Sequence, residues 1–161
     1  MKNNARLIVV IISLLVLILG AGYFYQRNRL NSAVSDLEIY FDNVDVKSFR
    51  LLPSPEANLT LIYVANNTKD IAFTITLDNG ELYYGKNFLT PLTISETQIK
   101  ADGLSTFQVD ITITGSILDT IDPEEKSEYI LQGELVASSQ FLGVVPVTTT
   151  KPVSELAPSQ N

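Results

Sequence analysis

An uncharged apolar run near the amino terminus constrains this chain more than any other feature. It extends over residues 7–25 with the sequence LIVVIISLLVLILGAGYFY. As a helix it would be about 28 Å long, close to the roughly 30 Å hydrocarbon core of a bilayer. A helix buried in a globular core normally has a polar stripe, which this run lacks. The run therefore predicts a transmembrane anchor over residues 7–25.

Residues on either side of the run predict its orientation. Lys2, Arg6 and the amino terminus make the leading end slightly more positive than the residues that follow the run. The positive-inside rule then places residues 1–6 in the cytoplasm and the rest of the chain outside. Aromatic residues at positions 23–25 suit a membrane interface. The prediction is a single-pass protein of the cytoplasmic membrane with its carboxy-terminal domain extracytoplasmic.

A cleaved signal peptide is the alternative interpretation of this segment. Residues 20–22, Gly-Ala-Gly, have the small side chains that a signal peptidase selects. The apolar run continues beyond them through three aromatic residues, which favours an uncleaved anchor. Residues 26–35, QRNRLNSAVS, are polar and predict a short tether between the membrane and the domain.

Charge is distributed unevenly along the chain. The whole chain has 11 basic and 18 acidic residues, and four of the bases but none of the acids lie within residues 1–35. The remainder holds seven bases against 18 acids, a net charge of −11. A domain with this negative charge repels the phosphate backbone of nucleic acids, so we expect no nucleic acid partner.

Two missing residue types limit the chemistry. The chain has no histidine and no cysteine, which excludes Ser-His-Asp and Cys-His catalysis and thiolate or histidine metal sites. Serine with lysine, or two carboxylates brought together by the fold, remain the enzymatic alternatives. No spacing in the sequence pairs them. We therefore predict no enzyme, no catalytic residues and no cofactor.

The densest acidic cluster lies near residue 120. Carboxylate oxygens close together can hold calcium. The spacing is not that of an EF-hand loop, and no glycine lies inside the cluster. An ordinary solvated loop is therefore favoured, and no metal site is predicted. The cluster consists of Asp119, Asp122, Glu124, Glu125 and Glu128.

Short strand-like segments separated by turn signals fill the chain from residue 36 onward. Apolar and polar residues alternate in residues 71–79 and 105–115, as in half-buried strands. Asn79-Gly80 predicts a hairpin turn between strands at 71–79 and 81–85. Pro146 predicts that the strand over residues 141–150 lies at a sheet edge. The remaining predicted strands are 37–41, 44–52, 57–66 and 128–138.

This spacing predicts an all-β fold, an antiparallel Greek-key β-sandwich over residues 36–153. One short helix is expected at about residues 117–121. Residues 154–161 are expected to form a disordered tail.

Two glycosylation sequons agree with an extracytoplasmic location. They are Asn58-Leu59-Thr60 and Asn66-Asn67-Thr68. Asn66 falls in a predicted turn and is the better candidate acceptor, whereas Asn58 falls at the start of a predicted strand. Sequons this short also arise by chance.

The order of these features resembles the water stress and hypersensitive response (WHy) domain, the folded subgroup of late embryogenesis abundant proteins. Residues 59–89, LTLIYVANNTKDIAFTITLDNGELYYGKNFL, are similar to its apolar strand, turn, second strand and return. Residues 91–113 resemble its loop and long alternating strand, and residues 129–147 its closing pair. The family's turn proline is missing at Asn66-Asn67-Thr68. The resemblance covers roughly residues 36–153, and the alternative is an unrelated immunoglobulin- or fibronectin-like sandwich.

The resemblance implies a small sandwich without catalytic residues that protects against desiccation, salt or osmotic stress. Together with the predicted anchor, it suggests a domain displayed on the outer side of a prokaryotic, more specifically archaeal, membrane. The alternative function is a protein–protein interaction module, an accessory subunit of an envelope or secretion complex. The identity of any protein partner is not predicted.

Overall fold

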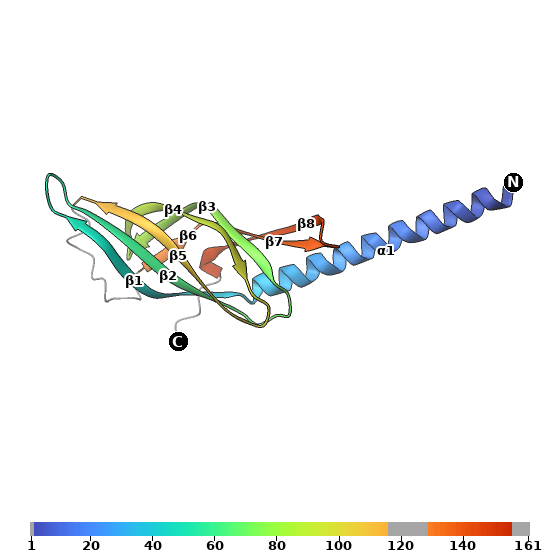
Figure 1. The fold of residues 1–161 in the computed structure, drawn as a ribbon, viewed down its shortest axis with the longest axis horizontal. Coiled ribbons are helices and arrows are strands. Elements are labelled where there is room, and N and C mark those ends of the chain that lie inside the picture. The colour runs from blue at the N-terminus through green and yellow to red at the C-terminus, as the bar shows by residue number, and fades with distance from the viewer. Residues whose placement is uncertain (1, 116–128, 156–161) are drawn as a thin grey trace.

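A computed structural model describes residues 2–115 and 129–155. The chain begins with one long helix, α1, and continues as a β domain (Figure 1). The elements are α1 Lys2–Ser35, β1 Glu38–Arg50, β2 Glu56–Asn67, β3 Phe73–Tyr84, β4 Asn87–Ile99, β5 Gly103–Thr114, β6 Tyr129–Gln132, β7 Glu134–Phe141, β8 Val145–Pro152 and the 3₁₀ turn η3 Val153–Glu155.

The strands form two antiparallel sheets, as predicted. One sheet has the order β1-β2-β5, and the other has the order β4-β3-β7-β8 with β6 also paired to β3. β2 and β5 are neighbours although β3 and β4, which lie between them in sequence, belong to the other sheet. Such a return after a hairpin in the opposite sheet is typical of Greek-key sandwiches. The predicted fold class, an antiparallel β-sandwich, is confirmed.

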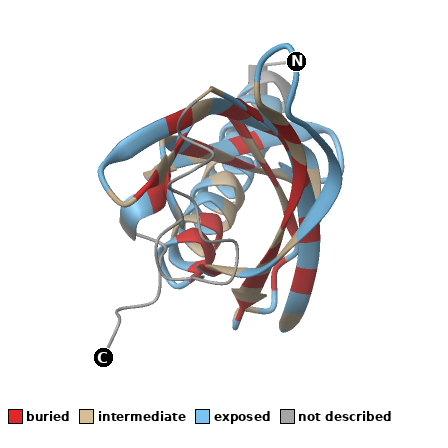
Figure 2. Ribbon diagram, turned by 90° about the vertical axis from the view of Figure 1, so that its left-hand side faces the viewer, coloured by how far each residue is buried: buried red, intermediate tan, exposed pale blue. Residues whose placement is uncertain are grey.

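The buried faces of the strands form a single hydrophobic cluster (Figure 2). In β5 the residues Phe107, Val109, Ile111 and Ile113 are buried, and the polar residues between them are exposed. On the neighbouring strand β2 the odd-numbered residues from 57 to 65 are likewise buried. The alternation predicted for residues 105–115 therefore marks the core face of β5 correctly.

The predicted hairpin at Asn79-Gly80 is wrong. Residues 73–84 form one continuous strand, β3, and its pairing with β4 shifts register between Leu77 and Gly80. A Cβ on Gly80 would lie 2.5 Å from Leu77 Cδ2 and 2.9 Å from the carbonyl oxygen of Leu92. The glycine thus permits close approach inside an irregular strand pair. Because of the shift, buried positions change from odd to even numbers along β3.

Three further strand boundaries differ from the prediction. The segments at 37–41 and 44–52 join into one long strand, β1. Residues 87–99 form β4, whereas the family resemblance implies a loop from residue 91 onward. The predicted strand over 128–138 divides at Gly133, which has φ +141°, into β6 and β7. The prediction that the strand containing Pro146 is an edge strand is confirmed, because β8 ends the order of its sheet.

The tether predicted for residues 26–35 is also wrong. These residues continue α1 to Ser35, and Leu30, Ala33 and Val34 are completely buried in the core cluster. The helix α1 contacts β7 and β8. The prediction failed because only three apolar side chains among these ten residues turn toward the sandwich, too few to outweigh the polar composition of the segment.

Two predictions fall wholly or partly on residues that the structure leaves undescribed. The short helix expected at 117–121 lies outside the described residues. At the carboxy terminus, Val153 is buried and its backbone N–H donates to the carbonyl oxygen of Gly133 at 2.9 Å. Residues 154–155, predicted to be part of a disordered tail, complete η3 instead, and the rest of that tail lies outside the described residues.

Candidate functional site

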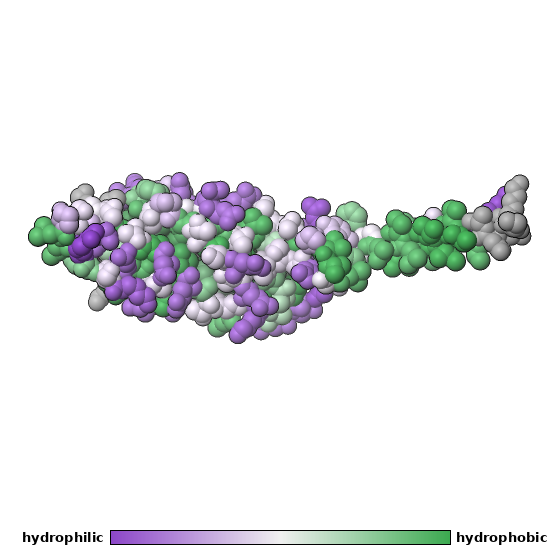
Figure 3. All heavy atoms as spheres, turned by 45° about the horizontal axis from the view of Figure 1, so that its top comes forward, coloured by the Kyte–Doolittle hydropathy of each residue, from purple (hydrophilic) through white to green (hydrophobic). Residues whose placement is uncertain are grey.

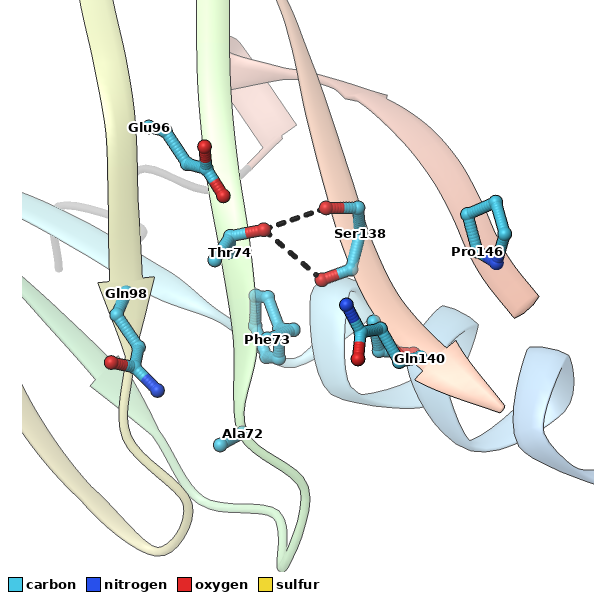
Figure 4. Close-up of a pocket in the computed structure, with 9 residues that line it drawn as sticks. Ala72, Phe73, Thr74, Glu96, Gln98, Ser138, Gln140 and Pro146 are labelled. Carbon is cyan, nitrogen blue, oxygen red and sulfur yellow. Dashed lines mark hydrogen bonds between the residues drawn. The ribbon is translucent and has the colours of Figure 1, made fainter. Parts of the chain in front are cut away.

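A polar groove lies on the surface of the larger sheet, over β3, β4 and β7 (Figure 4). Its volume is about 380 Å³. Glu96 and Gln98 of β4 line one side, and Gln140 lines the other. All three side chains are exposed, so the groove is open to solvent.

The hydroxyl groups in this groove bond to each other and to backbone. Thr74 Oγ1 lies 2.6 Å from Ser138 Oγ and donates to the Ser138 carbonyl oxygen at 3.3 Å. Among the residues lining the groove, Glu96 alone is ionisable. Among the described residues, the Thr74 and Ser138 hydroxyls hydrogen-bond to each other and not to the Glu96 carboxylate, the base that an activated nucleophile would require. The groove can form hydrogen bonds with a polar molecule.

Among the residues that the structure describes, no three His, Cys, Asp or Glu side chains lie close enough together to hold a metal ion. The acidic cluster from Asp119 to Glu128 falls outside these residues. Its predicted character as a solvated loop therefore stays a prediction.

Both predicted glycosylation sites lie in β2, the central strand of the smaller sheet. Asn58 is half-buried, and its amide donates to Ser48 Oγ at 2.9 Å and accepts from Thr112 Oγ1 at 2.6 Å. Asn66 is half-buried as well and donates to Glu38 Oε2 at 3.3 Å. Asn66 thus lies in a strand and not in the predicted turn. Glycosylation at either residue remains a prediction.

The neighbouring Asn67 has a structural role that the sequence analysis missed. It is 1% exposed, and its Nδ2 donates to the carbonyl oxygens of Ile71 and Lys100, each at 2.8 Å. Its Oδ1 accepts from the backbone N–H of Lys69 at 3.1 Å. One side chain therefore satisfies backbone groups of two turns, β2–β3 and β4–β5. In the sequence, only its position in Asn66-Asn67-Thr68, which corresponds to the turn of the WHy domain, indicates this role.

Two ion pairs join α1 to the β2–β3 turn. Arg29 Nη2 lies 2.7 Å from Asp70 Oδ1, and Lys69 Nζ lies 2.7 Å from Asp36 Oδ2, just beyond the helix. The hydrogen bond from Arg29 lowers the pKa of the Asp70 carboxyl below its ordinary value. The side chain of Arg29 is therefore directed to the domain.

A second contact joins α1 to the tip of the β7–β8 hairpin. The ring of Phe141 packs against Gly22, where an added Cβ would lie 2.9 Å from Phe141 Cζ. The same ring makes an edge-to-face contact with Tyr23, with centroids 6.1 Å apart. Gln26 Nε2 donates to Ser139 Oγ at 3.5 Å one turn further along. The hairpin therefore lies along the helix where the helix leaves the domain (Figure 1).

The opposite end of the molecule carries an apolar tip, formed by the β1–β2 connection (Figure 1). Phe49, Leu51 and Leu52 are 57%, 64% and 80% exposed there. These three residues, the distal tip, are among the exposed large apolar side chains of the acidic domain. Exposed apolar side chains gathered in this way mark contact surfaces more often than isolated ones do.

Comparisons with known proteins identify no family. No protein-family model matches the chain, and no curated protein matches it. A solution structure of a protein assigned to the late embryogenesis abundant group is similar, with 12% identity, a TM-score of 0.36 and coverage of 84% of this chain and 86% of that one. A protein from Archaeoglobus fulgidus is similar with 9% identity, a TM-score of 0.33 and coverage of 70% and 93%.

The first of these belongs to the protein group that the sequence resemblance indicates. Likenesses of this size concern the fold at most and transfer no activity. Membership of the WHy family therefore stays a prediction.

Proposed function

We propose that this chain is a non-enzymatic, membrane-anchored WHy-like domain, held outside the cytoplasmic membrane of an archaeal cell, that protects the envelope under desiccation or osmotic stress. It would do so through its surface, by retaining water and ions near the bilayer or by keeping neighbouring proteins apart. No cofactor is needed for such a role.

The helix α1 provides the strongest support for anchoring. It is the one helix, among the residues described, that is long and apolar enough to cross a membrane. The large apolar side chains from Leu7 to Leu19 are between 46% and 69% exposed, and they form a continuous hydrophobic rod (Figure 3). Leaving so much apolar surface in water is unfavourable, and a bilayer would cover it.

The build of the domain supports a surface role. The interior is filled by aliphatic and aromatic side chains, and the Thr74 and Ser138 hydroxyls of the polar groove bond to each other rather than to the Glu96 carboxylate. A net charge of −11 beyond residue 35 gives the domain a well-hydrated surface that resists self-association. Such a surface suits a protective protein near the bilayer.

Gene deletion tests the stress role. We expect cells lacking the gene to survive drying or osmotic upshift less well than wild-type cells and to recover when the full chain is restored. A chain carrying Leu61→Asp in the core, which would unfold the sandwich but keep the helix, should fail to restore survival. Equal survival of deleted and wild-type cells would contradict the proposal.

Topology is tested separately. The chain has no cysteine, so Leu52→Cys on the distal tip introduces a single thiol, at a side chain that is 80% exposed. A membrane-impermeant maleimide should label this thiol in intact cells. Labelling only after cell lysis would place the domain in the cytoplasm.

An interaction module is the second candidate function, and the distal tip favours it. Phe49, Leu51 and Leu52 project at the end of the domain farthest from the anchor, where an envelope partner could contact them (Figure 1). The expected result is a stoichiometric partner, co-purified in mild detergent with the wild-type chain and lost with Phe49→Ser/Leu52→Ser. Co-purification that persists in this variant would exclude the tip as the contact.

A further inference from the structure

We propose that the tip of the β7–β8 hairpin is a second membrane-contacting element that inserts into the lipid interface beside α1. The tip is defined as residues 141–145, Phe-Leu-Gly-Val-Val. This inference rests on the proposed anchoring of α1 and adds to it a contact that fixes how the domain sits on the bilayer.

The tip lies beside α1 near the end of the apolar run. Phe141 packs on Gly22 and Tyr23, which belong to the last turn of the apolar run at residues 7–25. Gly22 and Tyr23 lie two to three helical residues, or about 3–4.5 Å, before the end of the apolar run at residue 25. When the run fills the hydrocarbon core, Phe141 lies at the boundary between acyl chains and headgroups.

The tip exposes apolar side chains. Leu142 is 68% exposed and Val144 is 79% exposed, so neither side chain is buried in the core of the domain. A tight turn with positive φ at Leu142 (+54°) and Gly143 (+73°) places them at the extreme end of the hairpin. Exposed aliphatic side chains at the level of an apolar helix suit acyl chains as their environment.

The distribution of charge favours lipid over a polar surface. No charged residue occurs from Leu135 to Thr150, although the chain beyond residue 35 has a net charge of −11. Carboxylates on a hairpin near the headgroups would be repelled by anionic lipids, and charged side chains of either sign would resist insertion into the bilayer. The apolar surface around the point where α1 leaves the domain continues that of the helix (Figure 3).

Two membrane contacts, α1 and the hairpin tip, fix the orientation of the domain on the bilayer, whereas one contact does not. A single helix allows the domain to rotate about the helix axis and leaves its tilt to lipid forces. A hairpin tip beside the helix directs one side of the sandwich, that of β7 and β8, toward the bilayer. The distal tip then projects away from the membrane in a defined direction.

Site-directed fluorescence tests the inference. Single cysteines at Leu142, Val144, Leu15 and Leu52 would carry an environment-sensitive fluorophore in the full chain, reconstituted into phosphatidylcholine–phosphatidylglycerol vesicles with spin-labelled lipids. We expect quenching at 142 and 144, stronger for shallow than for deep spin labels. Leu15 should be quenched by deep labels, and Leu52 should be unaffected.

The outcomes separate the two proposals. Quenching at 15 without quenching at 142 and 144 would overturn the hairpin contact and leave the anchor intact. Absence of quenching at 15 would contradict the anchor and the hairpin contact together. Energy transfer between copies labelled at 142, without lipid quenching at that residue, would also overturn the inference, because a second copy would then cover the tip. Unchanged circular dichroism of each variant would show that the fold is retained.

Discussion

Arg29 on α1 and Asp70 on the β2–β3 turn form an ion pair in which Nη2 lies 2.7 Å from Oδ1, and Arg29 also donates to the Asp70 carbonyl oxygen at 3.2 Å. The pair lies just beyond the apolar run. It joins the helix that would lie in the membrane to the domain outside it, and its bonding is sensitive to acid.

Acid should weaken this pair. The pKa of Asp70 is lowered in the folded chain, first by the hydrogen bond from Arg29 and second by its charge. A lowered folded-state pKa contributes stability at pH values above the ordinary pKa, near 4, and that contribution is lost as pH falls through the folded value. Carboxyl chemical shifts of Asp70 measure its pKa directly. Arg29→Gln should move that pKa upward toward the ordinary value.

Lys69→Gln is the matched control for Arg29→Gln. It removes the other ion pair, between Lys69 and Asp36, and should leave the pKa of Asp70 nearly unchanged. An Asp70 pKa that does not respond to Arg29→Gln would mean that the pair is not formed in solution.

Leu30→Ala should destabilise the sandwich although residue 30 belongs to the helix. Leu30 is completely buried in the core cluster, and removal of a buried leucine side chain costs about 2–5 kcal/mol. Denaturant unfolding in detergent micelles, followed by a probe in the β domain, measures the loss. Leu15→Ala, at a 52% exposed position of the same helix, should leave the unfolding midpoint unchanged. Equal midpoints for the two variants would contradict the docking of α1.

Gly80→Ala should destabilise β3. The new Cβ would lie 2.9 Å from the Leu92 carbonyl oxygen, a backbone atom that cannot turn away. Overpacking of this kind costs roughly 1–3 kcal/mol. Gly103→Ala is the control, since its nearest contact would be an ordinary 3.6 Å, and it should change stability by less than about 0.5 kcal/mol. Thermal denaturation distinguishes the two, and a harmless Gly80→Ala would support the hairpin turn that the sequence predicted.

Two adjacent asparagines should respond differently to alanine. Asn67→Ala removes three hydrogen bonds and leaves the carbonyl oxygens of Ile71 and Lys100 without this donor. Each buried group left unsatisfied costs about 1–3 kcal/mol, so we expect a total loss of roughly 2–4 kcal/mol. Asn66→Ala loses one bond of 3.3 Å and should cost less than about 0.5 kcal/mol. Similar unfolding free energies for the two variants would refute the bridging role of Asn67.

Sequence reasoning succeeded where one physical signal dominates. The alternation at Phe107, Val109, Ile111 and Ile113 identified the core face of β5, because each side chain of a half-buried strand meets either protein or water. Pro146 identified an edge strand, because proline has no N–H to donate to a sheet ladder. Both signals are local and need no knowledge of the rest of the fold.

It failed where the deciding contact is distant in sequence. Asn79-Gly80 is a strong turn signal, but Gly80 lies inside a strand, where Leu77 and the backbone of Leu92 leave no room for a side chain. Residues 26–35 are polar enough for a linker, yet Leu30 and Val34 are buried in the core cluster of the sandwich. The candidate groove joins Thr74 to Ser138 across 64 positions, and no local pattern in the sequence signals such a pair.

The central claim is that anchor and sandwich form one body, because α1 continues without interruption from the apolar run into the core. Paired spin labels on Leu17→Cys and Leu104→Cys, exposed positions in the run and in β5, test this by pulsed electron resonance in vesicles. The account predicts a single narrow distance distribution between the two labels. A broad distribution, as a flexible tether at residues 26–35 would give, would contradict it.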